Sequence, residues 1–132
     1  RGLDVLKLTP SDYLTANEIE AANDAFPAIG SKRLFNPQQQ IPMTWPGNPD
    51  VALAYIDQLI RDNAIEEKTA ENMIDKLGKA KIAMEKGGSR RLARQIKGFN
   101  LPSEELDIDQ RTRDRIIRLD STLKTIAEDL QN

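Results

Sequence analysis

The sequence contains neither histidine nor cysteine among its 132 residues. The absence of cysteine excludes disulfides, thiolate metal sites and cysteine nucleophiles, and it leaves the redox compartment open. The absence of histidine excludes a serine–histidine catalytic pair. Phosphate-binding loops are also missing, because Gly87-Gly88 is only a pair and follows a predicted helix rather than a strand. Glu67 and Glu71 lie four residues apart and are interpreted as solvated carboxylates. We therefore expect no enzyme activity and no cofactor.

Long apolar runs are missing as well, since the longest span only a few residues against the roughly 20 that a bilayer requires. We predict no membrane-spanning helix. With 39% hydrophobic and 30% charged residues, the composition is typical of one folded, water-soluble domain. The chain starts at Arg1 and lacks a signal-peptide pattern, so we expect a mature, cleaved or excised piece.

The proline content divides the sequence near Asn48. Before that residue prolines recur, and each removes a backbone donor and disfavours helical geometry in its predecessor. These prolines are Pro10, Pro27, Pro37, Pro42 and Pro46. We predict an N-terminal arm over residues 1–48, with one short helix and an extended proline-rich segment, and a helical bundle over residues 49–132.

The one helix expected in the arm runs from about Thr15 to Phe26. Thr15 and Glu18 have the spacing of a capping box. The predicted buried face of this helix is Ile19, Ala22 and Phe26.

From residue 49 onward the apolar residues recur with helical spacing. The pattern predicts four helices, over about 49–61, 66–86, 89–99 and 108–130. Their expected buried faces are, in order, Ala52, Tyr55, Ile56, Leu59 and Ile60; Ala70, Met73, Ile74, Leu77, Ala80 and Met84; Leu92, Ala93, Ile96 and Phe99; and Ile116, Leu119, Leu123, Ile126 and Leu130. No segment alternates as a strand does, so the predicted fold class is all-α, an antiparallel four-helix bundle.

An acidic run precedes the last predicted helix. It comprises Glu104, Glu105, Asp107 and Asp109. An EF-hand calcium loop starting at Asp107 would require glycine where Thr112 stands and glutamate where Arg118 stands. The EF-hand interpretation therefore fails, and we expect these carboxylates to cap the helix, with no metal site.

A basic stretch runs from Lys76 to Lys97. It contains eight cations and one anion, Glu85, so its charge is near +7 while the rest of the chain sums to about −9. The eight cations are Lys76, Lys79, Lys81, Lys86, Arg90, Arg91, Arg94 and Lys97.

Within this stretch we predict a solvent-facing basic face on one short helix, made of Arg90, Arg91, Arg94 and Lys97. Three interpretations stay open: charges that pair with the acidic helices, a site for an acidic polysaccharide or acidic protein, and a nucleic-acid site. Nucleic acid is the least favoured, because no aromatic residue is interleaved to stack on a base.

The stretch PQQQIPMTWPGNP, residues 37–49, holds four prolines and the only tryptophan of the chain. Leaving so apolar an extended segment in water is unfavourable, at about 25 cal/mol per Å². The segment is either a strap across its own bundle or a docking arm for another protein. The candidate partner-binding residues of the arm are Phe35, Ile41, Met43 and Trp45.

The predicted core positions of the helical half also follow the pattern of a known domain family. They are Gln58-Leu59, Ile65, Ala70 with Ile74 and Leu77, Ala80 with Met84, Gly87, and Gln95 to Phe99. Over about residues 50–130 this pattern resembles the FIMAH domain, a small helical module. The sequence departs from the family at Phe99-Asn100-Leu101-Pro102. FIMAH-like modules occur mostly at the ends of large secreted or surface bacterial proteins, often beside carbohydrate-active or hydrolytic domains. The resemblance implies no functional residues.

Together these observations predict a non-catalytic accessory, attachment or assembly module of a secreted or surface bacterial protein complex. Its expected partner is a larger protein or complex, with an acidic polysaccharide as a further candidate. The expected location is extracellular, at the cell surface or in the periplasm. The alternative is a cytoplasmic binding subunit that uses the Lys76–Lys97 patch on nucleic acid or an acidic partner.

Overall fold

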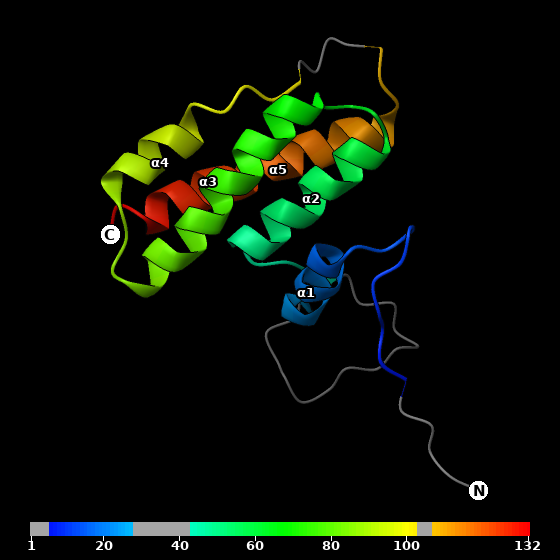
Figure 1. Cartoon of the computed structure of the whole chain (residues 1–132), viewed down its shortest axis with the longest axis horizontal. Helices are drawn as coiled ribbons and strands as arrows, with labels where there is room; N and C mark the ends of the chain where they lie inside the picture. The colour runs from blue at the N-terminus through cyan, green and yellow to red at the C-terminus, as the bar shows by residue number, and fades with distance from the viewer. Residues whose placement is uncertain (1–5, 28–42, 103–106) are drawn as a thin grey trace, which may run out of the picture.

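The structure is a computed structural model that describes residues 6–27, 43–102 and 107–132. Five helices account for most of these residues (Figure 1). They are α1 (Ala16–Asp24), α2 (Pro49–Arg61), α3 (Glu67–Glu85), α4 (Arg90–Lys97) and α5 (Gln110–Asp129). Two short strands, β1 (Phe26–Pro27) and β2 (Met43–Thr44), pair in antiparallel fashion. The chain is therefore all-α, as its apolar periodicity predicts.

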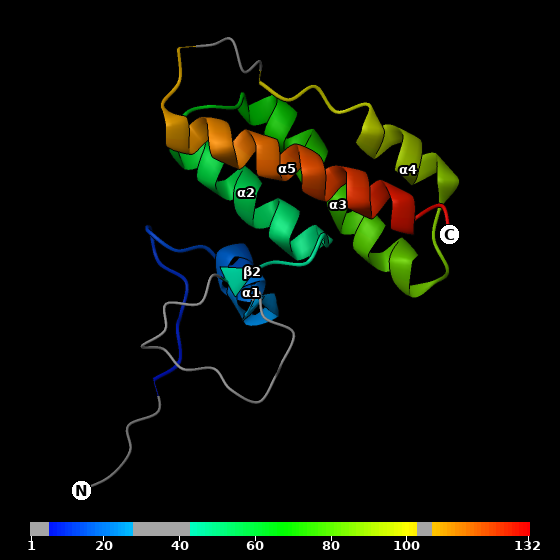
Figure 2. The same cartoon turned by 180° about the vertical axis from the view of Figure 1, so that it is seen from behind.

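Helices α2 to α5 form a four-helix bundle. Helix α2 packs beside α3 and α5, and α4 packs beside the same two helices from the other side. Successive helices run in opposite directions, as Figures 1 and 2 show from front and back. Helix α1 lies outside the bundle, against α2. Helix α1 of the predicted N-terminal arm is thus in contact with the bundle.

Side-chain caps start four of the five helices. In each case the cap oxygen accepts the N–H three residues further on, which satisfies a donor that the helix itself leaves unpaired. The caps are Thr15, Asn48, Ser89 and Asp109. Thr15 and Glu18 form the predicted reciprocal capping box. The last helix begins at Gln110, two residues later than expected, because Asp109 is its cap.

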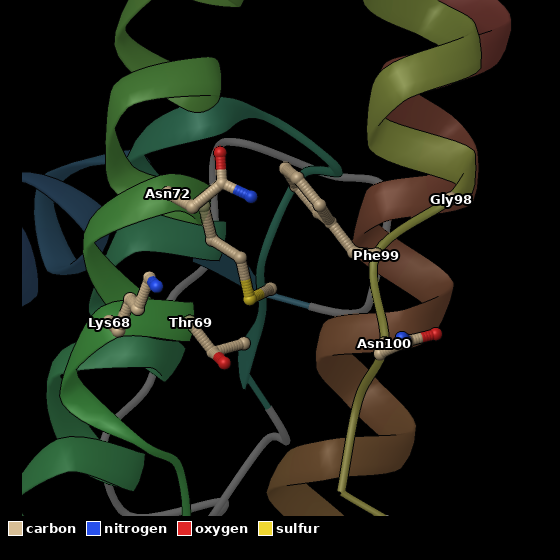
Figure 3. A pocket seen from close by; sticks show the side chains of 7 residues that line it. Lys68, Thr69, Asn72, Gly98, Phe99 and Asn100 are labelled. Atoms are coloured by element: carbon tan, nitrogen blue, oxygen red, sulfur yellow. The ribbon is translucent and has the colours of Figure 1, made fainter.

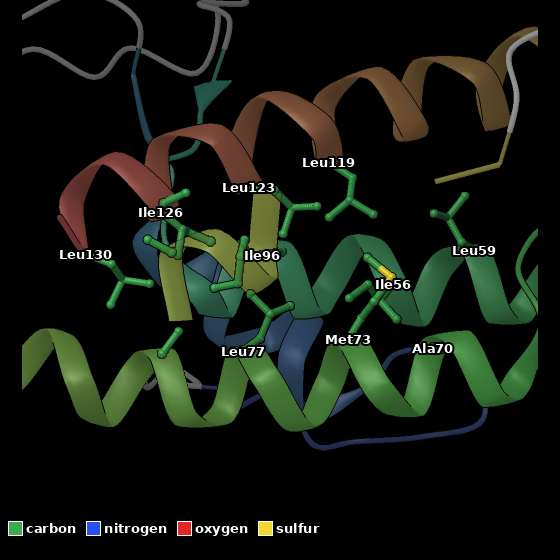
Figure 4. Close-up of a cluster of buried hydrophobic side chains, with 14 of the residues drawn as sticks. Ile56, Leu59, Ala70, Met73, Leu77, Ile96, Leu119, Leu123, Ile126 and Leu130 are labelled. Atoms are coloured by element: carbon green, nitrogen blue, oxygen red, sulfur yellow. The ribbon is translucent and has the colours of Figure 1, made fainter. Parts of the chain in front are cut away.

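The core of the bundle is a single aliphatic cluster to which all four helices contribute (Figure 4). The α5 stripe is buried as predicted: Ile116, Leu119, Leu123, Ile126 and Leu130. On α2 and α3 the prediction is wrong at Ile60 and Ile74, which are 39% and 36% exposed. Both lie at the edge of their stripes, where the helix surface turns away from the neighbouring helices. Tyr55, Met84, Leu92 and Phe99 pack against the core while half-buried.

The predicted face of α1 is also wrong. Glu18 and Ala21 are buried, Ile19 is half-buried and Ala22 is exposed. The side chain of Phe26 lies outside the described residues. The face is rotated because α1 is held on α2 partly by polar contacts, which an apolar pattern does not reveal.

Helix α1 ends at Asp24, two residues before the expected end. Phe26 and Pro27 instead pair with Thr44 and Met43. The sequence pattern predicts no strand, and this two-residue ladder is an addition that leaves the fold class unchanged.

A glycine turn joins α3 to α4. Gly87 and Gly88 have φ of +98° and +91°, in the left-handed region that favours glycine. The N–H of Ser89 then donates to the carbonyl of Leu130, at 2.8 Å. A Cβ on Gly88 would lie 2.5 Å from that carbonyl oxygen. The turn is therefore bound by a backbone hydrogen bond to the C-terminal end of α5.

Candidate functional site

The predicted basic face lies on α4. Arg90, Arg91, Arg94 and Lys97 are all exposed, while Ala93 and Ile96 are buried against α3 and α5. At 3.6 residues per turn, positions 90, 94 and 97 share one stripe beside the buried pair, and Arg91 lies opposite that pair. The structure thus gathers all four predicted residues on one solvent-facing surface.

Ion pairing separates α4 from Lys76, Lys79 and Lys81, the cations of the basic stretch that lie on α3. Lys79 pairs with Asp75 at 2.7 Å, and Lys81 pairs with Asp50 of α2 at 2.8 Å. The Asp50 hydrogen bond raises the pKa of the Lys81 ammonium above its ordinary value. The four basic-face residues form no ion pair with any residue in the described ranges. Pairing with carboxylates therefore explains some of the cations on α3. It explains none of the four cations of the basic face.

The arm residues are only partly described, because Phe35 and Ile41 lie outside the described residues. Met43 and Trp45 are 38% and 42% exposed. Just beyond them the backbone of Gly47 lies against α5, where an added Cβ would be 2.6 Å from the side chain of Thr125. Asn48 then caps α2. Residues 47 and 48 thus lie against their own bundle, whereas Met43 and Trp45 keep more than a third of their surface exposed.

Trp45 stands at the junction of α1, α2 and α5, between two adjoining hollows of about 250 and 260 Å³. Both hollows are lined by Trp45, Tyr55 and Arg118, and we call the pair the Trp45 corner. Figure 2 shows β2, which leads into Trp45, beside α1. The corner is open to solvent, since two-fifths of Trp45 and more than a third of Arg118 are exposed.

The two hollows differ in character. The first adds Met43, Thr44, Val51, Ser121 and Thr122 to the shared residues. The second adds Leu14, Glu18, Ala21, Ala22, Ala54 and Gln58. Arg118 forms no ion pair with a described residue. Thr122 donates its hydroxyl proton to the carbonyl of Arg118 at 2.8 Å, which fixes the local backbone.

Glu18 is the one carboxylate that lines the corner within the described residues, and it is neutralised by α2. Its two oxygens accept from Arg61 Nη2 and Nη1 at 2.5 and 3.2 Å. Burial acts to raise the pKa of the Glu18 carboxyl, but hydrogen bonds from Arg61 and the Thr15 N–H outweigh it. The pKa therefore lies below the ordinary value of 4.5.

A second group of hollows surrounds the segment that follows α4. One, of about 340 Å³, lies between this segment and α3 (Figure 3). Phe99 reaches across it toward Asn72, while Asn100 points away. Another, of about 360 Å³, lies between α4 and α5, with Phe99, Leu101 and Leu123 as its apolar part and Lys97 at its rim. Phe99 separates these two hollows and packs on the core, so its main role is structural.

Within the acidic run Asp109 caps α5, whereas Asp107 is exposed and is not the cap residue. Asp109 accepts from the N–H of Thr112 at 2.7 Å, and this bond lowers the pKa of the Asp109 carboxyl. Glu104 and Glu105 lie outside the described residues. Across the described ranges no cluster of three metal-ligating side chains could hold an ion.

Glu67 and Glu71 are exposed on α3. Among the described helices, none has the length and apolar character needed to cross a bilayer.

Comparison of the chain with protein-family models, with curated proteins and with solved structures found no match. The resemblance to the FIMAH family gains no support from these comparisons and stays a prediction. Arg118 was missed by the sequence reasoning, because one arginine among the polar positions of α5 gives no signal until the fold brings Trp45 beside it.

Proposed function

We propose that the chain is a non-catalytic attachment or assembly module that binds an acidic partner through the basic face of α4. The observation that carries the proposal is the exposure of four neighbouring cations that no described residue neutralises. Such a cluster raises the local concentration of polyanions through its summed field. The partner is an acidic polysaccharide or an acidic surface of a larger protein.

Two features favour these partners over nucleic acid. Helix α4 carries no aromatic side chain, and Phe99 beyond it is half-buried against the core. Bases would therefore find no stacking surface beside the cations. The FIMAH resemblance adds support for a secreted or surface bacterial setting outside the cytoplasm. A cytoplasmic subunit that contacts nucleic-acid phosphates is the alternative.

The test is retention on immobilised polygalacturonate, with neutral dextran and duplex DNA in parallel, over a series of salt concentrations. The key variant changes Arg90, Arg91, Arg94 and Lys97 to Gln. Its control removes the same charge elsewhere, by changing Lys7, Lys68, Lys79 and Arg111 to Gln.

We expect the native chain to bind polygalacturonate with strong salt dependence. The basic-face variant should lose at least about tenfold in affinity, and the control should stay within about twofold. Equal losses in both variants would show that net charge, rather than this face, determines binding. Tighter binding to DNA than to polygalacturonate would favour the nucleic-acid alternative.

The arm supplies a second candidate docking element. Met43 and Trp45 keep more than a third of their surface exposed, as do Leu8 and Tyr13 nearer the N-terminus. We propose that the arm attaches the module to a larger protein. Native isolation of the chain and of Trp45→Ala checks this. Release of a still-helical variant from a large complex would support docking, whereas a monomeric variant that only melts earlier would identify a strap.

A further inference from the structure

The Trp45 corner has properties that the basic face does not share. It is built by α1, α2, α5 and the residues before α2, and α4 contributes nothing to it. The side chain at its centre is the only tryptophan of the chain. An exposed aromatic ring beside two hollows is a typical element of a small-ligand site.

One half of the corner is cationic. Arg118 lines it, as it lines the other half, together with Ser121 and Thr122 of the same helix. No carboxylate lines this half within the described part of the chain. A guanidinium in such a position can hold a carboxylate through two parallel hydrogen bonds.

The other half is mainly apolar. Leu14, Ala21, Ala22 and Ala54 line it beside Trp45. The small alanine side chains leave room next to the indole. Its only carboxylate, Glu18, is already held by Arg61 and adds little net charge.

An occupant of either hollow lies against both Trp45 and Arg118, because both residues line both hollows. Covering an unpaired guanidinium removes it from water, which is unfavourable unless the occupant brings an opposite charge. The apolar half in turn favours a hydrocarbon or aromatic group. We propose that the Trp45 corner binds a carboxylate that bears an apolar group, with the carboxylate on Arg118 and the apolar group against Trp45.

Tryptophan fluorescence tests the proposal on the full chain, since Trp45 is the only source of the signal. The first probe is N-acetyl-phenylalanine. Two control compounds each lack one half of the probe. N-acetyl-phenylalaninamide lacks the carboxylate charge, and acetate lacks the apolar group. We expect a saturable change with N-acetyl-phenylalanine, with a Kd on the order of 1 mM, as is typical of a ligand of this size. The amide and acetate should each bind at least about tenfold more weakly. Equal binding of the amide, or of acetate, would overturn the assignment.

Variants locate the contact. Arg118→Gln should weaken N-acetyl-phenylalanine binding at least about tenfold, and Arg118→Lys should keep part of the affinity because it keeps the charge. Arg94→Gln, which changes an equal charge on the basic face, should bind as the native chain does. Far-UV circular dichroism checks that each variant is folded. An unchanged affinity in a folded Arg118→Gln would overturn the proposal, and polygalacturonate retention reports separately on the basic face.

The same chemistry occurs in a free organic acid and in the last residue of a peptide. 3-Phenylpropionate, which has no peptide group, separates the two sources. Equal affinity for the two probes would identify a free acid as the ligand. At least about tenfold tighter binding of N-acetyl-phenylalanine would identify a peptide C-terminus with an apolar final residue. Failure of both probes would reject the site.

Discussion

The bundle and the α1–α2 contact are held together in different ways. In the bundle, the buried cluster consists only of alanine, isoleucine, leucine and methionine. Between α1 and α2 the buried apolar cluster has three small members, Ala21, Val51 and Ala54. Polar bonds supplement it: Thr15 and Asn17 donate to one oxygen of Asp57, at 2.6 and 2.9 Å, and Glu18 pairs with Arg61.

The difference predicts two levels of stability. Aliphatic burial is non-directional and adds up over many side chains, so the bundle should unfold as one unit. The α1 contact depends on a few bonds whose geometry must be right, and it buries little apolar area. We expect α1 to detach from α2 at a lower free energy than the bundle unfolds, as elements with few buried contacts do.

The largest effect should come from the bundle core. Leu119→Ala removes a side chain with no exposed surface and leaves a cavity between helices. We expect a loss of about 2–5 kcal/mol in the free energy of unfolding. Urea denaturation followed by far-UV circular dichroism measures it. The control is Ile117→Ala on the same helix, where the side chain is 45% exposed and the expected cost is within about 0.5 kcal/mol. Similar costs for the two variants would contradict the assigned packing.

A smaller and local effect is expected at the α1 contact. Glu18→Gln leaves Arg61 without its anion, and Arg61 is about one-third exposed, so water offsets part of the loss. We expect the α1 contact to weaken by roughly 1–2 kcal/mol. Hydrogen exchange of α1 amides should accelerate about tenfold while that of α3 and α5 stays unchanged. Glu20→Gln, an exposed neighbour on the same helix, should change neither. Acceleration throughout the bundle would show that the two regions are one cooperative unit.

The smallest effect is expected from acid. Lowering the pH should weaken the α1–α2 contact of the native chain while the bundle stays folded. The pKa of Glu18 is lower in the folded state than its ordinary value of 4.5. Its contribution is therefore present above about pH 4.5 and is lost as the pH falls through the folded pKa. Trp45 fluorescence should report the loosening of α1, because residues of α1 line the Trp45 corner. In Glu18→Gln this transition should be absent. A transition of the same size in that variant would assign the acid response to other carboxylates.

The sequence predicts the bundle well because one physical rule determines it. The stripe on α5 has apolar residues alternately three and four apart, and a helix with that spacing must bury them. The caps are equally local, since Asn48 and Asp109 need only the N–H groups three residues away. The errors at Ile60 and Ile74 arise where the stripe ends, which depends on how neighbouring helices cross.

Such local rules do not predict contacts between segments that lie far apart in the sequence. Glu18 is buried because Arg61 lies 43 residues later in the chain. No periodicity in α1 indicates that partner, so the apolar pattern predicts the wrong buried face for this helix. The Trp45 corner likewise requires α1, α2 and α5 together, and only the unusual position of the tryptophan indicated that the region mattered.

The bond between Ser89 and Leu130 has a consequence for the order of folding. An eight-residue helix is too short to be stable by itself, and α4 packs between α3 and α5. The N–H of its cap residue, Ser89, donates to the carbonyl of Leu130 at the end of α5, 41 residues further along the chain. We therefore expect α4 to reach its final place only after α5 has docked, so that a growing chain acquires the basic face only once residue 130 has left the ribosome.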